Sequence, residues 1–292
     1  MQPPSPLLPS LHNLPSPPAP HPRAAALVGA PASPVMPGVF SNRDSLKAAV
    51  DELLALDPTG NTPHPVHGHI KTWDVSKVTN MSTLFANAAS FNATIDTWDV
   101  SNVRDMSSMF GGAYSFNQPL DSWNVSMVVN MHFMFEDARS FNRPLNYWNV
   151  SNVQNMWSMF QDATSFNQPL DYWDVSRVET MKSMFKNAIS FNQPLNNWDV
   201  SRVRHMGEMF NDAKSFNQPL DRWDVSFVYD MSNMFDGAES FNQPLDRWDV
   251  SNVRYTTHMF NGATSFDRAA HAPPHTHAAA LVGAPAKAVT QA

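Results

Sequence analysis

The sequence contains no cysteine, which excludes disulfide scaffolds, thiolate metal sites and cysteine nucleophiles. Charged residues make up only 15% of the 292 residues, and the formal net charge is −7. A nucleic-acid-binding surface needs a basic stripe, so we expect no nucleic-acid partner. No apolar run reaches the roughly 18 residues of a transmembrane helix, so no such segment is expected. In contrast to these absences, the chain carries 9 Trp, 17 Met and 19 Phe beside only 10 Gly.

Most of the tryptophans lie at a strict interval of 25 residues, and only Trp157 falls outside the series. When each tryptophan of the series is taken as offset 0 of a repeat, Val recurs at offset +2, Ser at +3, and Phe at +12 and +18. Periods of about 20–50 residues are typical of solenoids and other repeat architectures. The series consists of Trp73, Trp98, Trp123, Trp148, Trp173, Trp198, Trp223 and Trp248. The sequence therefore predicts eight stacked units.

Within one unit, apolar residues fall at offsets 0, +2, +5, +8, +11, +12, +15, +18 and +22. The only spacing of two is Trp-x-Val, which is typical of a strand, whereas steps of three or four suit short helical turns. We therefore predict an α/β repeat, a right-handed solenoid whose Trp-x-Val strands form a parallel sheet on one face. A pentapeptide solenoid would need a core spacing of five, and a propeller blade needs about 40 residues.

The aromatic side chains at offsets 0, +12 and +18 are expected to fill the interior of the coils, because each can bury about 150–250 Å². A cofactor site built on the aligned methionines is the less favoured alternative, so no cofactor is expected. The central core positions are predicted to be Trp98, Trp123, Trp148, Trp173, Trp198, Trp223, Phe110, Phe116, Phe160 and Phe166.

Four segments are predicted along the chain. Residues 1–39 form a proline-rich tail expected to be disordered, without the features of a secretory leader. Residues 40–72 form a helical cap that begins with a Ser41–Asp44 capping box and buries a stripe from Leu46 to Leu56. Residues 73–267 form the repeat array. Residues 268–292, rich in Ala and His, are expected to be disordered.

Several polar positions also repeat. Asn at +19 is expected to form a ladder of hydrogen bonds to the backbone of the adjacent coil, and the Ser hydroxyl at +3 is expected to cap the following turn. Offset +1 carries Asp or Asn in every unit, which would bring like charges on neighbouring coils close together. Capping of backbone N–H groups, pairing with Arg or Lys, and binding of a cation are the three explanations that remain open.

Variable outward positions are the better guide to recognition. Offset +24 carries Tyr147 and Tyr172, then Arg222 and Arg247, which would form a contiguous strip of residues favoured at interfaces. Scattered substitution on a tolerant surface is the alternative explanation. We add Asp174 and Asp224, at offset +1, to these candidate partner-binding residues. Other candidates for exposure are the aromatic residues Trp157, Phe227 and Tyr229.

Catalytic chemistry has little support in the sequence. No phosphate-binding glycine loop, nucleophile elbow or clustered acid–base pair occurs, so we expect no enzyme and no catalytic residue. Histidines cluster before and after the array, but without a fixed second shell they are not expected to bind a metal. These two groups are His64, His67 and His69, and His271, His275 and His277.

The segment 106–126, MSSMFGGAYSFNQPLDSWNVS, resembles the repeats of BspA-type leucine-rich-repeat surface proteins. It is still more similar to the DUF285 repeats of mycoplasma lipoproteins. The approach to the array also resembles the family, with the segment 67–70 leading into Trp73-Asp74-Val75-Ser76. The resemblance covers about residues 40–267. It implies a leucine-rich-repeat-like solenoid, exposure at a cell surface, and a protein-binding or adhesive role.

These observations together predict a non-enzymatic interaction module, a monomer that binds a protein or glycan partner through the strand face of its solenoid. The alternative is a structural cell-surface spacer or adhesin, in which the array supplies reach without a single defined site.

Overall fold

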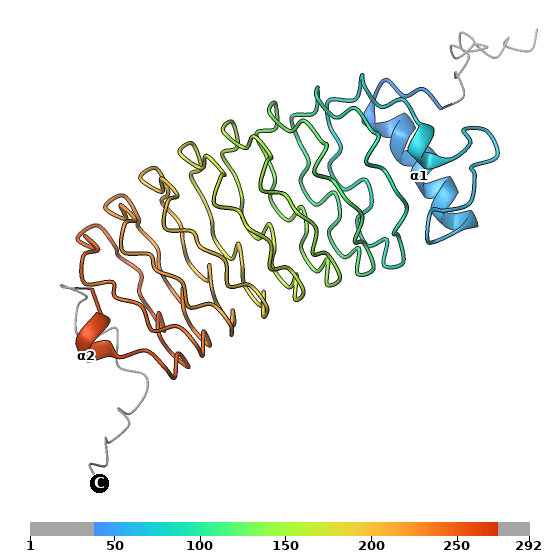
Figure 1. Cartoon of the computed structure of the whole chain (residues 1–292). Helices are drawn as coiled ribbons and strands as arrows, with labels where there is room; N and C mark the ends of the chain where they lie inside the picture. Colours follow the sequence, from blue (N-terminus) through green and yellow to red (C-terminus); the bar gives the residue numbers. More distant parts are fainter. Residues whose placement is uncertain (1–37, 274–292) are drawn as a thin grey trace, which may run out of the picture. The chain divides into compact units, whose positions relative to one another are not determined.

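A computed structural model of the protein describes residues 38–273, which all lie in one unit of the chain, Met36–Ala292. The predictions for residues 1–37 and 274–292 fall outside these described residues. Three helices occur within them: α1 (Arg43–Leu56), the 3₁₀ helix η1 (Ile70–Thr72) and α2 (Arg268–His271). Between η1 and α2 the chain winds in coils of one repeat each, and successive coils lie side by side (Figure 1). The predicted repeat architecture is confirmed.

Neighbouring coils are joined by a parallel ladder of backbone hydrogen bonds. The N–H groups at offsets +8, +10, +12 and +14 donate to the carbonyl oxygens at +7, +9, +11 and +13 of the next coil. For example, Met156 N–H donates to Thr180 O at 3.1 Å and Phe160 N–H to Met184 O at 2.9 Å. All seven junctions of the array repeat these four bonds. At offset +7 the ladder forms a continuous series of parallel bridges from Asn80 to Tyr255.

The ladder owes its geometry to residues with left-handed backbone conformation. Offsets +10 and +14 have positive φ in every coil, as at Ser158 (52°) and Asp162 (58°). These positions follow the third-residue pattern of type II turns, and the N–H groups of Met159 and Ala163 close the turns onto the carbonyls three residues earlier. As a result, alternate peptide groups all point their N–H toward the next coil and their C=O toward the previous one.

The predicted position of the strands is wrong. Among the described residues, the backbone from Trp173 to Val175 makes no hydrogen bond to a neighbouring coil, and the flanking N–H groups of Trp173 and Val178 close local turns instead. The predicted helical turns are absent too: residues 73–267 contain neither helix nor extended strand. The spacing of two at Trp-x-Val reflects two buried side chains on an irregular segment, whereas the ladder forms where left-handed residues turn the N–H groups outward. The right-handed, leucine-rich-repeat-like class stays a prediction.

The core is a continuous column of apolar side chains that passes through every coil. All ten aromatic residues expected there are buried, with exposed fractions of at most 4%. Within a coil the rings of Phe160 and Phe166 stack at 4.1 Å, and between coils the rings of Phe160 and Phe185 stack at 5.7 Å. Each array tryptophan from Trp98 onward donates its indole N–H to the backbone carbonyl 28 residues earlier, as Trp173 does to Leu145 O at 2.9 Å.

The expected ladder of asparagines is present at offset +19. The side-chain oxygen of each asparagine accepts the backbone N–H of the equivalent residue in the next coil, from Asn92 to Asp267, at 2.9–3.1 Å. The amide of the following glutamine often joins the same oxygen, as Gln193 does on Asn167. From Asn117 onward the backbone N–H groups at offset +19 are therefore hydrogen-bonded, although none of them has a backbone acceptor among the described residues.

Helix α1 covers the N-terminal end of the array (Figure 1). Leu46, Ala49, Val50 and Leu53 are buried as expected, but Leu56 at the last position of the helix is 59% exposed. The predicted capping box is also wrong. Asn42 caps the helix, its side-chain oxygen accepting the N–H of Ser45 at 2.9 Å, because Ser41 lies one residue too early to reach that group.

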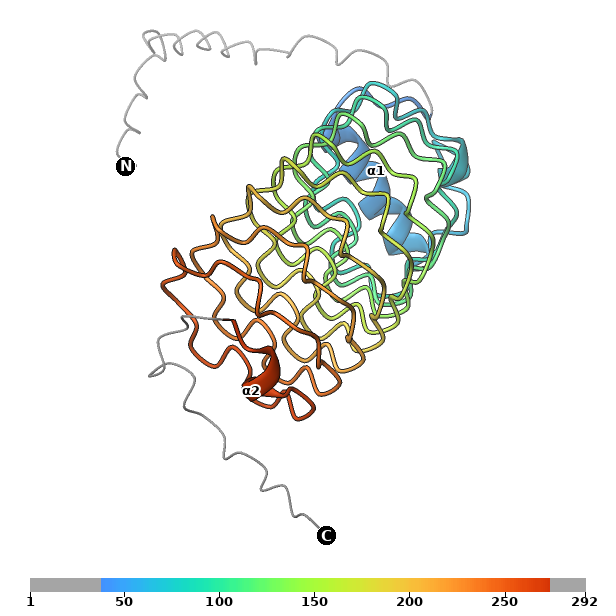
Figure 2. The same ribbon diagram turned by 60° about the vertical axis from the view of Figure 1, so that its left-hand side comes forward.

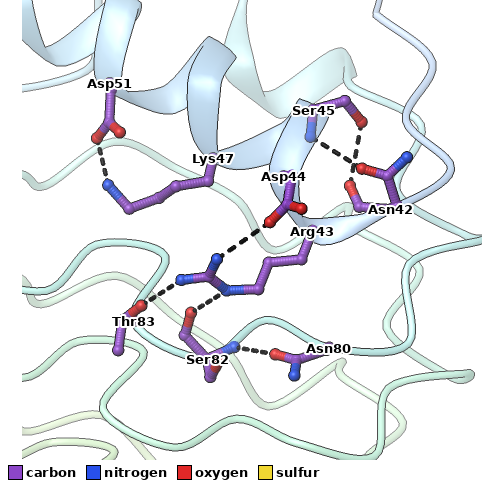
Figure 3. Close-up of polar contacts among 9 residues, drawn as sticks. All are labelled: Asn42, Arg43, Asp44, Ser45, Lys47, Asp51, Asn80, Ser82 and Thr83. Atoms are coloured by element: carbon purple, nitrogen blue, oxygen red, sulfur yellow. Dashed lines mark hydrogen bonds and ion pairs between the residues drawn. The ribbon is translucent and has the colours of Figure 1, made fainter.

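Arg43 ties this cap to the first coil (Figure 3). Its Nε donates to Ser82 O at 2.9 Å and its Nη2 to Thr83 Oγ1 at 2.6 Å. Ser82 O is the offset +9 carbonyl, which in later coils accepts from the preceding coil. The guanidinium therefore replaces a missing coil at this position.

The C-terminal end is covered in part by α2, which lies against the last coil (Figure 2). Asp267 caps the helix by accepting the N–H groups of Ala269 and Ala270. His271 O accepts the N–H of Leu245 at 2.9 Å. Residues 268–271 are thus helical rather than disordered as expected from position 268 onward, because the end of the repeat core needs a cover.

Candidate interaction surface

The offset +24 column lies immediately before the buried tryptophans, on the outside of the coils. Tyr147 is 81% exposed and Tyr172 67% exposed. Their ring centroids are 5.9 Å apart with an interplanar angle of 35°, so the two rings form one surface feature. Arg222 and Arg247 are exposed as well. We call Tyr147, Tyr172, Asn197, Arg222 and Arg247 the tyrosine–arginine strip.

The backbone of this strip is held by asparagines one position earlier in the preceding coil. Asn146 Oδ1 accepts the N–H of Tyr172 at 3.1 Å, and Asn196 Oδ1 accepts the N–H of Arg222 at 3.0 Å. Arg222 Nη1 lies 3.5 Å from Asn197 Oδ1 in the neighbouring coil. The strip therefore projects variable side chains from a fixed backbone, an arrangement suited to recognition.

The Asp and Asn residues at offset +1 act as caps. In each coil the side-chain oxygen accepts the N–H of the serine at +3 at 3.0–3.1 Å. Of the explanations left open by the sequence, backbone capping is the one that the structure shows. The expected role of the serine hydroxyl is reversed, because the hydroxyls of Ser76 and Ser151 donate to the cap residue rather than capping the following turn.

Asp174 and Asp224 are both exposed, next to the tyrosine–arginine strip in sequence. The hydroxyl and N–H of Ser176 lower the pKa of Asp174, and the charge of Arg177 lowers it further. An exposed carboxylate held in its charged form can contact a partner while it still caps its own turn. The contact of Asp174 that the structure shows, however, is the cap on the N–H of Ser176.

Two aromatic clusters were not assembled by the sequence analysis. Trp157, 40% exposed, packs against Phe133 of the preceding coil at 4.8 Å. Tyr229 packs edge-on against Tyr255 at 5.2 Å, and the guanidinium of Arg254 lies 5.5 Å from the ring centre of Tyr229. In both clusters the two rings lie at different offsets, +9 with +10 and +6 with +7. Their contact could be predicted only if the position of the ladder were already known.

The histidines before the array support the cap. His64 is buried, its Nδ1 accepts the N–H groups of Val66 and His67, and its Nε2 lies 3.1 Å from Glu52 Oε2. His67 Nδ1 accepts the N–H of Gly38 at 3.0 Å. Burial lowers the pKa of His67, as does the neighbouring His64. Both nitrogens of His64 are thus engaged in structural contacts.

Across residues 38–273 no group of three or more His, Cys, Asp or Glu side chains is arranged to hold a metal ion. His271 belongs to α2, whereas His275 and His277 lie outside the described residues. In the same described range, every helix is too short or too polar to cross a bilayer.

No curated protein matches the chain. Among solved structures, one described as "Crystal structure of TLR13-ssRNA13 complex" is similar over 78% of this chain and 30% of its own length, with 12% identity and a TM-score of 0.34. The chain thus spans about a third of the length of that structure. The family described as "Mycoplasma protein of unknown function, DUF285" matches twice, over residues 60–173 and 160–272. Because these matches cover more than half of the sequence, the chain belongs to the DUF285 family.

Proposed function

We propose that the array is a non-enzymatic interaction module that binds a protein or glycan partner through the tyrosine–arginine strip. The observation that carries this proposal is the pair Tyr147 and Tyr172, two large exposed side chains in contact on neighbouring coils. Tyr and Arg are favoured at interfaces because they offer a large contact area with polar ends. The two arginines further along the strip add donors for carboxylate or carbonyl groups.

The finer assignments belong to the same proposal. The resemblance to BspA-type proteins supports a right-handed, leucine-rich-repeat-like class and a role in adhesion at a cell surface. Solenoids of this kind present extended binding faces made of residues from many repeats. The strip, which draws one residue from each of five coils, has that form.

The test is a binding screen with the full chain against a glycan array and a panel of purified extracellular protein domains. Ligands found in this way are then measured with a variant in which Tyr147, Tyr172, Arg222 and Arg247 are all changed to Ser. We expect binding to be lost while the circular dichroism spectrum stays unchanged, since all four side chains are exposed.

A matched control changes the exposed aromatic residues Phe227 and Tyr114, outside the strip, to Ser and is expected to bind normally. If every ligand is retained by the fourfold variant, the strip is not the binding surface.

A structural spacer is the second candidate, and the uniformity of the seven junctions favours it. A spacer tolerates the loss of whole repeats with only a shorter reach, whereas a site that extends over several coils loses affinity. Deletion of two complete repeats, residues 174–223, removes Asn197 and Arg222 and leaves Tyr147, Tyr172 and Arg247 on three consecutive coils. Unchanged ligand affinity in this variant supports the spacer.

A further inference from the structure

The last coil leaves open the backbone N–H groups that join every other coil to its successor. At the seven junctions these groups donate to carbonyls of the next coil. In the last coil they belong to Thr256, His258, Phe260 and Gly262, and within residues 38–273 none of them has an acceptor. Of these four residues His258 and Gly262 are exposed, Thr256 is half-buried and Phe260 is buried. We call residues 255–262 the donor edge.

The donor edge has the same backbone conformation as the paired segments. His258 and Gly262 have positive φ, 56° and 69°, like the equivalent residues of all other coils. The turn bonds also persist, with Met259 N–H donating to Thr256 O at 3.1 Å and Ala263 N–H to Phe260 O at 3.3 Å. The edge is therefore preformed, which reduces the entropy lost when an acceptor segment adds to it.

Peptide dipoles give this edge a positive character. In each coil the alternate peptide groups point their N–H toward the C-terminal end of the array, and the hydrogen bonds link them head to tail. As in a helix, aligned peptide groups leave partial positive charge at the N–H end and negative charge at the C=O end. At the C=O end a cation is in place, since the Arg43 guanidinium donates to Ser82 O (Figure 3). At the N–H end, Arg254 and His258 are exposed.

The helix at the same end does not satisfy the donor edge. Helix α2 joins the last coils through His271 O, which accepts from Leu245, and through Arg268, whose Nη2 donates to Phe260 O at 2.9 Å. Both contacts leave the four N–H groups of the edge without an acceptor in the described range.

A second copy of the chain is a poor occupant. Two donor edges facing each other would oppose N–H to N–H, which forms no hydrogen bond. The complementary acceptor edge of a second copy lies in its first coil, where α1 and Arg43 cover the end. A second copy is therefore not the occupant that we favour, and we look for the acceptors in a different molecule.

We propose that the donor edge binds an acidic peptide segment of a partner protein, whose carbonyl groups take the place of a further coil. Addition of a segment to an open edge is a recurring mode of peptide recognition. The seven junctions show what the segment must offer: carbonyls at alternate residues, and residues such as Gly, Asn or Asp that accept positive φ. Acidic side chains would be attracted by the partial positive charge at the N–H end of the aligned peptide groups and by the exposed Arg254.

The protein itself supplies a probe. Residues 229–240 (YDMSNMFDGAES) carry the acceptors that Met206, Glu208, Phe210 and Asp212 use in the array. The corresponding peptide, labelled with a fluorophore, would be titrated with the full chain, and amide hydrogen exchange would be followed at the donor edge by NMR. At about ten times the dissociation constant, exchange at Thr256, His258, Phe260 and Gly262 should slow by about tenfold.

Variants separate edge binding from other causes. Thr256→Pro removes one edge N–H and should weaken peptide binding about three- to tenfold. Thr257→Pro is the matched control: it lies at the second position of the turn, which proline favours, and its N–H is not one of the edge donors. It should leave the affinity unchanged within about twofold. Amide spectra show whether each variant remains folded, and the exchange measurement on the unaltered chain does not depend on either variant.

Three outcomes would overturn the proposal. The first is unchanged exchange at the donor edge with saturating peptide. The second is equal protection by sulfate alone, which would indicate an anion site rather than a peptide site. The third is equal binding by a peptide in which Asp230, Asp236 and Glu239 are replaced by their amides, which would remove the acidic preference.

Discussion

Each array tryptophan from Trp98 onward both fills the coil interior with its ring and donates a hydrogen bond to the backbone carbonyl 28 residues earlier. Trp173 is 3% exposed and its Nε1 donates to Leu145 O at 2.9 Å. Replacement of a buried Trp by Ala costs about 3–5 kcal/mol in total, and a buried carbonyl left without a partner accounts for about 1–3 kcal/mol of such a loss. The two contributions can be separated at this one position.

We predict that Trp173→Ala lowers the free energy of unfolding by about 3–5 kcal/mol, and Trp173→Phe by about 1–3 kcal/mol. Phenylalanine retains most of the ring packing but leaves Leu145 O without its donor. Urea unfolding followed by circular dichroism measures both values. Exposed Trp157, changed to Phe, serves as the control and should cost far less. A negligible effect of Trp173→Ala would mean that the ring is not part of the core.

At the scale of the element, the N-terminal cap depends on an uncharged imidazole. His67 Nδ1 accepts the N–H of Gly38, and Gly38 O in turn accepts the N–H of Asp74 at 2.6 Å. Protonation of Nδ1 would turn this acceptor into a donor and break the first contact. Burial and the neighbouring His64 lower the pKa of His67 in the folded state below its ordinary value of 6.5.

Stability of the cap should therefore fall on acidification. Below pH 6.5 the unfolded chain binds a proton at His67 more readily than the folded chain, so the free energy of unfolding decreases as the pH falls and is unaffected by this group at higher pH. Thermal unfolding between pH 8 and pH 5 would measure the slope, which His67→Gln should reduce. His69→Gln, at an exposed position, should leave the slope unchanged. Identical pH profiles for the wild type and His67→Gln would exclude this role.

The sequence predicts the core of each coil well but not the path of its backbone. The buried offsets can be predicted because Trp, Met and Phe recur at fixed positions, and side chains of this size must lie in the interior of the coils. At offset +14 the left-handed backbone also had a signal, since the position holds only Gly, Asn or Asp, as at Gly112 and Asn187. At +10, however, residues as different as Phe133 and Glu208 adopt positive φ. Tertiary hydrogen bonds impose this conformation against local preference, so no pattern reveals it.

In the candidate site, too, some features could be predicted from the sequence and others could not. Exposure of Tyr147 and Tyr172 follows from the burial of the next residue, and contact between them follows from stacking at the repeat interval. The pair Phe133 and Trp157 lies at different offsets, so its contact depends on the slant of the ladder between coils. Contacts along a single column can thus be predicted from a repeat sequence, and contacts between columns cannot.

On the scale of the whole molecule, the array behaves as a one-dimensional stack. Each coil bonds only to its two neighbours through the same backbone groups, and both ends have their own covers, α1 and α2. In such a stack, stability is approximately a sum of identical units and junctions. Removal of one unit in register should therefore join its neighbours without a defect.

Deletion of residues 174–198 tests this expectation, because it joins Trp173 to Asp199 and keeps every column aligned. We predict a folded protein with an unchanged circular dichroism spectrum per residue and a urea m-value lower by roughly one tenth, since less surface is exposed on unfolding. Deletion of residues 174–193, five residues short of a repeat, is the control: it joins Trp173 to Pro194 and puts Leu195 where the core needs Val at +2. That variant should lose cooperative unfolding. If both deletions unfold the protein equally, the coils are not interchangeable, and the stack is held by contacts specific to individual repeats.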